Sequence, residues 1–70
     1  MNSPFVIRMQ QEKLELDTKL LKLIEFVESD KFSCLDAIQQ RNLLVQRHIM
    51  NAYSQILTAQ IDYDSEKEQK

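Results

Sequence analysis

His48 and Cys34 are the side chains in this sequence whose chemistry could most readily support catalysis. On a helix, the neighbours of His48 at three and four positions are Leu44, Val45, Asn51 and Ala52. None of these is acidic, and a catalytic histidine needs an orienting carboxylate or an adjacent nucleophile. Cys34 lies near a predicted helix start, where a thiolate is stabilised. We interpret His48 as a partly exposed or hydrogen-bonded side chain, and Cys34 as a structural or incidental thiol.

The acidic residues do not form a pair suited to acid–base chemistry. Arg8 and Glu12, like Glu15 and Lys19, have the i,i+4 spacing of ion pairs on a solvated helix face. A metal cage is disfavoured because His48 is the single histidine. We therefore predict that the protein is not an enzyme and that it holds no metal and no cofactor.

Composition restricts the fold and the partners. The chain has 70 residues with no glycine, one proline and one cysteine, which argues against tight hairpins and glycine-rich phosphate loops. A chain this small cannot pair its lone cysteine internally, so self-association is the remaining way to enlarge its core. The net charge of −2 disfavours nucleic acid. Neither a signal peptide nor a membrane span is predicted, and a lone cysteine fits a reducing compartment.

Two long helices are needed to position these side chains. Ser3-Pro4 is a typical helix start, and no breaker follows before about residue 29. After a connection at 30–33, Ser33 and Asp36 resemble a capping box for a second helix over 34–63. The acidic tail over 64–70 is expected to fray. We predict an all-α fold with a single domain over 1–70, a two-helix antiparallel hairpin with coiled-coil-like packing.

Each helix carries one main apolar row with alternating spacings of four and three. The first row, interrupted by Lys13, contains Phe5, Met9, Leu16, Leu20, Leu23 and Val27. The second contains Ile38, Asn42, Val45, Ile49, Ala52, Ile56, Ala59 and Tyr63. A sustained period of 3.5 indicates left-handed coiled-coil packing. We expect these two rows to face each other within the hairpin, although the reverse assignment of the faces is also possible.

Further apolar residues lie on the other side of each helix. They form the predicted interface between copies: Ile7, Leu14, Leu21, Leu43, Met50, Tyr53 and Leu57. One hairpin can cover only one row on each helix, and uncovered apolar area costs about 25 cal/mol per Å². We therefore expect self-association, most simply as a homodimer forming a four-helix bundle, with a higher oligomer left open.

Polar residues among these rows suggest two further roles. Asn42 either fixes the register of the helices or lies near a bundle end in contact with water. The candidate contacts for a ligand or partner are Arg8, Arg41, Arg47 and Tyr53. Arg41 and Arg47 point about 120° apart on a helix, so they do not form a continuous major-groove basic region.

The packing residues also resemble those of a family of small helical-hairpin proteins of tailed phages and prophages, including crAss-like phages. The similarity covers about residues 5–61. The first helix and the connection contribute Phe5-x-x-Arg8-Met9-x-x-Glu12-x-x-Glu15-Leu16, Lys22-Leu23-x-x-Phe26 and Phe32-x-x-Leu35. The second helix contributes Gln40-x-x-Leu43-Leu44, Gln46 and Met50-x-x-Tyr53-x-x-Ile56-Leu57. Gln60 departs from the pattern, because a basic residue is expected there.

This resemblance implies an accessory early-region protein, as in lambda-like phages, that acts by binding in the host cytoplasm. The leading hypothesis is a non-enzymatic homo-oligomer that modulates the host by binding a host protein. An oligomeric sponge that sequesters a nucleotide immune signal is the first alternative. A DNA-associated regulator is the second, and the acidic balance of the chain disfavours it.

Overall fold

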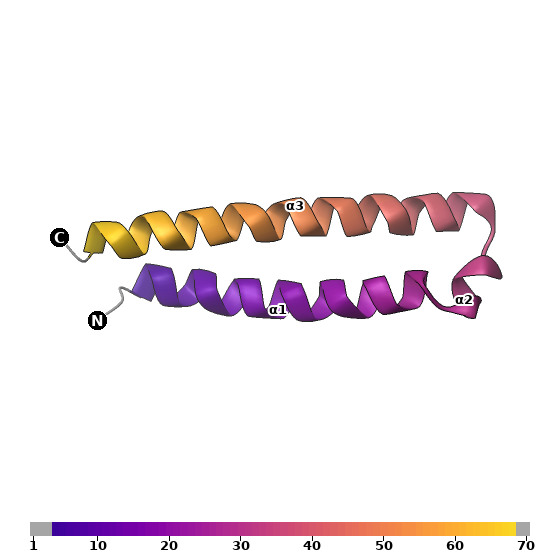
Figure 1. The fold of residues 1–70 in the computed structure, drawn as a ribbon, viewed down its shortest axis with the longest axis horizontal. Helices are drawn as coiled ribbons and strands as arrows, with labels where there is room; N and C mark the ends of the chain where they lie inside the picture. Colours follow the sequence, from indigo (N-terminus) through magenta and orange to yellow (C-terminus); the bar gives the residue numbers. More distant parts are fainter. Residues whose placement is uncertain (1–3, 69–70) are drawn as a thin grey trace.

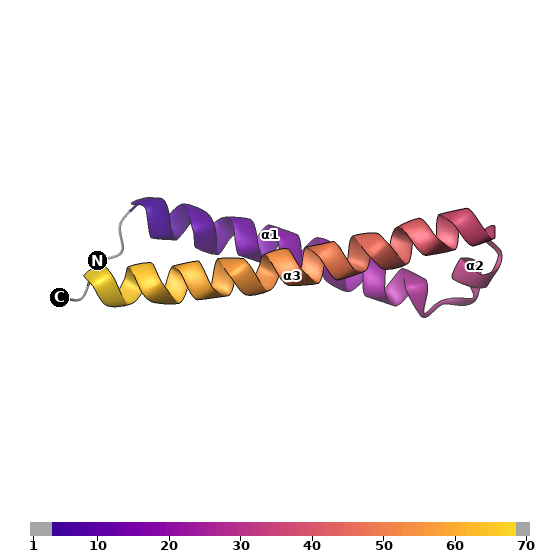
Figure 2. The ribbon, with the colours of Figure 1, turned by 90° about the horizontal axis from the view of Figure 1, so that it is seen from above.

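The computed structural model describes residues 4–68, which form three helices (Figure 1). Helix α1 spans Pro4–Val27, α2 spans Asp30–Ser33 and α3 spans Ala37–Glu68. Helices α1 and α3 run antiparallel side by side, with α2 at the turn (Figures 1 and 2). The molecule measures 52 × 15 × 14 Å, so it is a rod. The predicted all-α helical hairpin is confirmed.

The face of α1 toward α3 follows the predicted row closely. Met9 and Leu20 are buried, and Leu16, Leu23 and Val27 are half-buried. At the start of the row the buried side chain is Val6, whereas Phe5 is 65% exposed. Lys13 keeps its place in the row and is half-buried. The four-and-three spacing of α1 therefore identified its inner face, with a shift of one residue at the first turn.

The face of α3 toward α1 is not the predicted one. The buried and half-buried residues along it are Gln40, Leu43, Arg47, Met50, Ser54, Leu57 and Ile61. The more apolar row lies outside, with Ile38, Ile49 and Tyr63 all more than 60% exposed. The expectation that this row faces the first helix was wrong. The polar groups agree with this orientation, because Asp17 in the inner face of α1 has Ser54 opposite it as a hydrogen-bond partner.

The connection is built from helical turns. Helix α2 occupies the predicted connection at 30–33, and α3 begins at Ala37 rather than at 34. The cap of α3 is Asp36, whose Oδ1 accepts a hydrogen bond from the Gln39 N–H at 2.8 Å. Ser33 instead donates its hydroxyl hydrogen to the Asp30 carbonyl at 2.7 Å. Among residues 4–68 no residue has a positive φ, so the chain reverses without any position that requires glycine.

Gln40 joins this turn to the body of the hairpin. Its Nε2 donates to the carbonyl oxygens of Phe32 at 3.1 Å and Leu35 at 3.0 Å. These are carbonyls at the end of α2 and in the link that follows it, where helical partners run out. At the other end, α3 continues to Glu68 through most of the segment expected to fray, and Asp64 and Ser65 are half-buried. The rest of that segment, 69–70, lies outside the described residues, as does Ser3.

Candidate functional site

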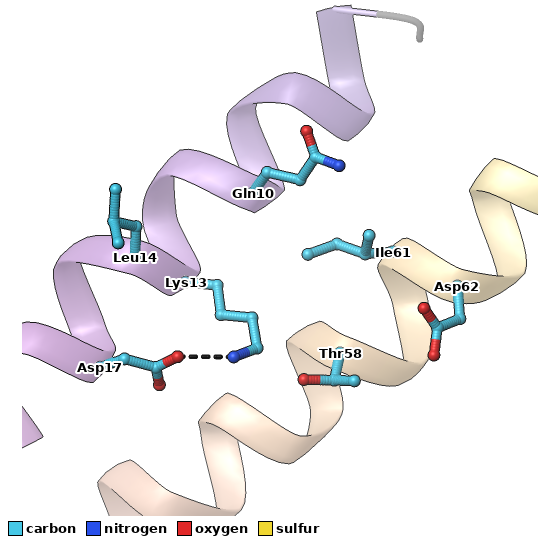
Figure 3. Close-up of a pocket in the computed structure, with 7 residues that line it drawn as sticks. All are labelled: Gln10, Lys13, Leu14, Asp17, Thr58, Ile61 and Asp62. Atoms are coloured by element: carbon cyan, nitrogen blue, oxygen red, sulfur yellow. Dashed lines mark hydrogen bonds and ion pairs between the residues drawn. The ribbon is translucent and has the colours of Figure 1, made fainter.

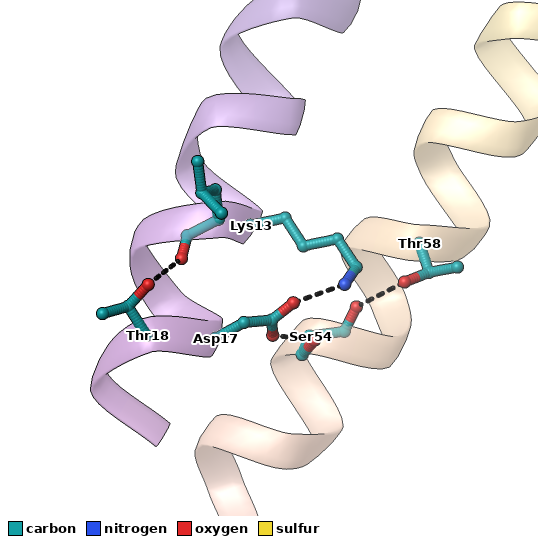
Figure 4. A network of polar contacts seen from close by, with 6 residues as sticks. Lys13, Asp17, Thr18, Ser54 and Thr58 are labelled. Carbon is teal, nitrogen blue, oxygen red and sulfur yellow. Dashed lines mark hydrogen bonds and ion pairs between the residues drawn. The ribbon is translucent and has the colours of Figure 1, made fainter. Parts of the chain in front are cut away.

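A polar layer crosses the middle of the hairpin (Figure 4). Lys13 Nζ lies 2.5 Å from Asp17 Oδ2, and Ser54 of α3 donates its hydroxyl hydrogen to Asp17 Oδ1, also at 2.5 Å. Ser54 is 9% exposed, so its hydroxyl is largely shielded from water. The hydrogen bonds from Lys13 and Ser54 lower the pKa of the Asp17 carboxyl below its usual value. This layer holds α3 in register against α1, whereas Asn42, the residue that the sequence suggests for this role, is exposed.

Beside this layer lies a shallow groove of about 360 Å³ (Figure 3). It is lined by Gln10, Lys13, Leu14, Asp17, Thr58, Ile61 and Asp62. Lys13 reaches across toward α3, but its ammonium group is already paired with Asp17 (Figure 3). With Asp62 as a second carboxylate in its wall, this groove does not suit an anion.

A second groove follows the open ends of α1 and α3. It has a volume of about 580 Å³ and a wall rich in aromatic and aliphatic side chains, including Phe5, Ile56 and Tyr63. The Tyr53 hydroxyl donates a hydrogen bond to Glu12 across the hairpin. Because this hydrogen bond favours the neutral phenol beside a carboxylate, it raises the pKa of Tyr53. Tyr53 is therefore engaged with α1, and Glu12 accepts from it rather than serving only the expected pair with Arg8.

The basic side chains of α3 border two adjoining hollows toward the turn. One, of about 380 Å³, lies between the helices and is lined by Leu20, Ile24, Leu44, Arg47, His48 and Asn51. The other, of about 500 Å³, lies along α3 and is lined by Ala37, Gln40, Arg41, Leu44, Val45, His48 and Ile49. Leu44 and His48 belong to both, so the two hollows form one continuous surface. Within the described chain, no acidic residue lines either hollow.

We call this surface the basic groove, defined by Arg41, Leu44, Val45, Arg47 and His48. Arg47 is half-buried, which holds its guanidinium near the helix interface, whereas the other four are exposed. Cationic groups over an apolar floor are suited to a ligand that combines a phosphate with a flat base. The sequence predicted Arg41 and Arg47 as contacts but not His48. The available signal was its spacing, because His48 lies four residues after Leu44 and three after Val45, on the same side of the helix.

The structure separates the remaining predicted contacts. Arg8 is exposed on α1 near the open ends, and Tyr53 lines the second groove at those ends, so neither lines the basic groove. The residues predicted to form one interface between copies lie on different faces of the hairpin. Ile7, Leu14 and Leu21 are exposed on α1, whereas Leu57 is 2% exposed and packs inside the hairpin. Leu43 and Met50 are half-buried on the same inner side of α3.

The possible metal ligands and the cysteine were also located. Over residues 4–68, no group of three or more histidine, cysteine, aspartate or glutamate side chains is arranged to hold a metal ion. Cys34 is exposed at the turn, with Sγ 3.6 Å from the Asp30 carbonyl oxygen. No helix in the same range is long and apolar enough to cross a membrane.

Comparison with known proteins places the chain in a family. No curated protein and no solved structure matches it. A family model described as Sequestin matches residues 3–63, which include α1, α2 and most of α3. Because that match covers most of the chain, this protein belongs to the Sequestin family.

Proposed function

We propose that this protein is a non-catalytic binder that sequesters a small anionic ligand of the nucleotide class. The observation that carries the proposal is the basic groove, where Arg41, Arg47 and His48 surround an apolar floor without an acidic neighbour. The name of the family, Sequestin, supports a sequestering role. Sequestration needs affinity and stoichiometric amounts of protein, and it needs no catalytic group.

The chemistry of the groove suggests how a nucleotide binds. The half-buried Arg47 guanidinium offers several N–H donors in a fixed plane, which suits the oxygens of a phosphate. His48 adds a hydrogen-bond donor on the shared edge of the two hollows. Leu44, which lines both hollows, forms the apolar floor on which a base can lie. Arg41 borders the groove on its outer side.

The resemblance to small phage proteins supports a setting for this activity. A phage protein of this kind would act in the host cytoplasm, as a homo-oligomer, by removing a nucleotide signal from a host defence pathway. In that setting the ligand is made by the host, and each bound molecule is withdrawn from its receptor. A DNA-associated role is not proposed, because the net charge of −2 opposes binding to a polyanion.

Isothermal titration calorimetry tests this proposal. The full chain is titrated with a panel of cyclic mono- and dinucleotides and adenosine diphosphate compounds, and we expect at least one to bind in the micromolar range or tighter. Arg47→Ala should weaken that ligand about 10-fold or more, since a hydrogen bond to a charged group contributes about 1.5–3 kcal/mol. The charge-matched control is Lys22→Ala, because Lys22 is exposed on the outer side of α1. Absence of binding across the panel at millimolar concentration would reject the nucleotide assignment.

Binding of a host protein is a second candidate function. It is favoured by three apolar residues on the side of α1 away from α3. Ile7, Leu14 and Leu21 are 51%, 68% and 58% exposed and lie seven residues apart. Such a row is typical of a helix that packs against another helix. Leu14→Asp should then abolish capture of one specific host protein, whereas Lys22→Asp should not. Equal capture by both variants would reject this candidate.

A further inference from the structure

The outer face of α3 carries a long apolar row that the hairpin does not use. We call it the outer row: Ile38, Asn42, Val45, Ile49, Ala52, Ile56, Ala59 and Tyr63. Its large members are 49–73% exposed. At 100° per residue the outer row lies about 150° from the row that packs against α1. No rearrangement of side chains within one hairpin can cover it.

We propose that the outer row is the contact between two copies of this chain, with their α3 helices antiparallel about a two-fold axis beside Met50 and Asn51. This inference rests on the self-association included in the proposed function and deepens it, because it assigns the face, the direction and the axis. Closed two-fold pairing is the commonest arrangement of homo-oligomers, and it brings the same patch of both copies together.

The spacing of the outer row makes it complementary to itself. Intervals of four and three read the same in both directions, so the antiparallel arrangement pairs each residue with the one at mirror position in the partner. Ile49 meets the partner's Ala52, and Asn42 meets the partner's Ala59. Val45 meets the partner's Ile56, and Ile38 meets the partner's Tyr63. At the centre a large side chain thus lies opposite a small one, which allows close packing of the helices.

Charge on the flanks of the outer row favours the antiparallel direction. The position before Asn42 is Arg41, and in an antiparallel pair its nearest flanking neighbour is the partner's Asp62. The two-fold axis creates this pair twice. Neither Arg41 nor Asp62 makes an ion pair within the described hairpin, and both are exposed. In the parallel direction Arg41 would instead meet the partner's Gln46, and the two copies of Asn42 would face each other in the core.

The small core of the hairpin explains why the second copy is this same chain. The buried apolar residues of the described chain are Val6, Met9, Leu20 and Leu57. A core of that size contributes little, and chains of this length commonly complete it by oligomerisation. A second copy is present wherever the first is made, and its own outer row needs the same cover.

In this dimer some residues of the basic groove contact the partner and others remain open to a ligand. Val45 and Ile49 line the hollow along α3 and also belong to the outer row, so the partner's α3 covers that hollow, whereas the hollow between α1 and α3 stays open. Arg41 is drawn to the partner's Asp62, which leaves Arg47 and His48 to hold an anion. Each dimer then carries two equivalent grooves, and Arg41 acts on assembly rather than on the ligand.

The native cysteine allows a direct test of the direction. Cys34 is exposed and is the single cysteine, so a spin label attached there reports one distance per dimer. In the antiparallel pair the two labels lie about 33 residues apart along the helices, or about 50 Å at 1.5 Å per residue. Double electron–electron resonance on the ligand-free full chain should therefore give about 50 Å or more. A distance below about 25 Å would mean a parallel pair and would overturn the inference.

Sedimentation velocity tests the face. We expect a dimer for the native chain, and Ile49→Asp should raise its dissociation constant at least about 100-fold. Leu14→Asp is the matched control, because Leu14 is 68% exposed but lies outside the outer row. Arg41→Asp should weaken the dimer several-fold and Arg41→Asp with Asp62→Arg should restore it, which keeps the test valid if Ile49→Asp unfolds the chain.

A monomeric native chain, a dimer lost equally with Leu14→Asp, or no rescue by the charge exchange would each overturn the inference. Assembly is measured without ligand. Failure of the dimer would therefore leave nucleotide binding by Arg47 and His48 to be judged by its own calorimetry, and a failed nucleotide screen would leave the dimer standing.

Discussion

The hydrogen bond from Ser54 to Asp17 should measurably stabilise the hairpin, and its contribution should depend on pH. A hydrogen bond to a charged partner contributes about 1.5–3 kcal/mol when it is shielded. The Asp17 side chain is 38% exposed, and solvent screening reduces this figure. We therefore expect Ser54→Ala to lower the free energy of unfolding by about 1 kcal/mol at neutral pH, which corresponds to about 4–8 °C in the melting temperature of a chain this size.

The sign of the pH dependence follows from the lowered pKa of Asp17. The unfolded chain takes up a proton near the ordinary value of 3.8, while the folded chain resists it to lower pH. The stabilisation is thus present above that value and is lost as pH falls through the folded pKa. The difference between the native chain and Ser54→Ala should accordingly shrink from neutral pH to about pH 2.5.

Urea unfolding followed by circular dichroism provides the assay, with protein concentration held constant because assembly shifts apparent stability. Asp17→Asn is the second background, since it keeps the size of the side chain and removes its charge. Ser54→Ala should cost much less there than in the native chain at pH 7. An equal cost in both backgrounds, or an equal cost at both pH values, would refute the assignment of this stability to the Asp17 charge.

Two further substitutions test the core and the hairpin ends. Leu57→Ala should lower the free energy of unfolding by about 2–5 kcal/mol, because Leu57 is 2% exposed. The control, Leu14→Ala, should change it by less than about 0.5 kcal/mol. Similar denaturation midpoints for the two variants would contradict the burial of Leu57. The raised pKa of Tyr53 predicts stability that is present below pH 10 and lost as pH rises through its folded value. Absorbance titration at alkaline pH should show one phenol titrating above 10 that is missing in Tyr53→Phe, and a native curve equal to the sum of ordinary phenols would contradict the hydrogen bond to Glu12.

The two long helices and one of the two packing faces could be predicted from the sequence. The row of Met9, Leu16 and Leu20 identified the inner face of α1 because its apolar residues recur at spacings of four and three, whereas those on the other side recur only every seven residues. On α3 the more apolar row faces outward, so the expectation that the more apolar row of each helix packs inside the hairpin is wrong there. Apolar content shows which rows avoid water, but it does not show whether the same chain or another molecule covers them.

Several features of the hairpin that the sequence did not predict are polar and non-local. Asp17 and Ser54 are 37 residues apart, and nothing in the spacing of either helix links them. The start of α3 was misplaced for a similar reason. Ser33 and Asp36 are both good helix caps, and the choice depends on α2, a four-residue helix too short to leave a periodic pattern. Arg47 and His48 could be placed on α3 from sequence, but the hollow between them depends on Leu20 and Ile24 of α1.

The turn without glycine has a further consequence, which concerns the unfolded chain. About 7% of residues in an average protein are glycine, so about five would be expected in a chain of this length. Each glycine that is replaced without strain stabilises the fold by about 0.4–1 kcal/mol, because the unfolded chain then has fewer conformations to lose. The described backbone has no positive φ, so the absence of glycine introduces no strain there. The total, about 2–5 kcal/mol, matches what the small core of such a chain supplies. Relative to a chain of average glycine content, the restricted freedom of the unfolded state therefore adds to the stability that the contacts of this rod provide.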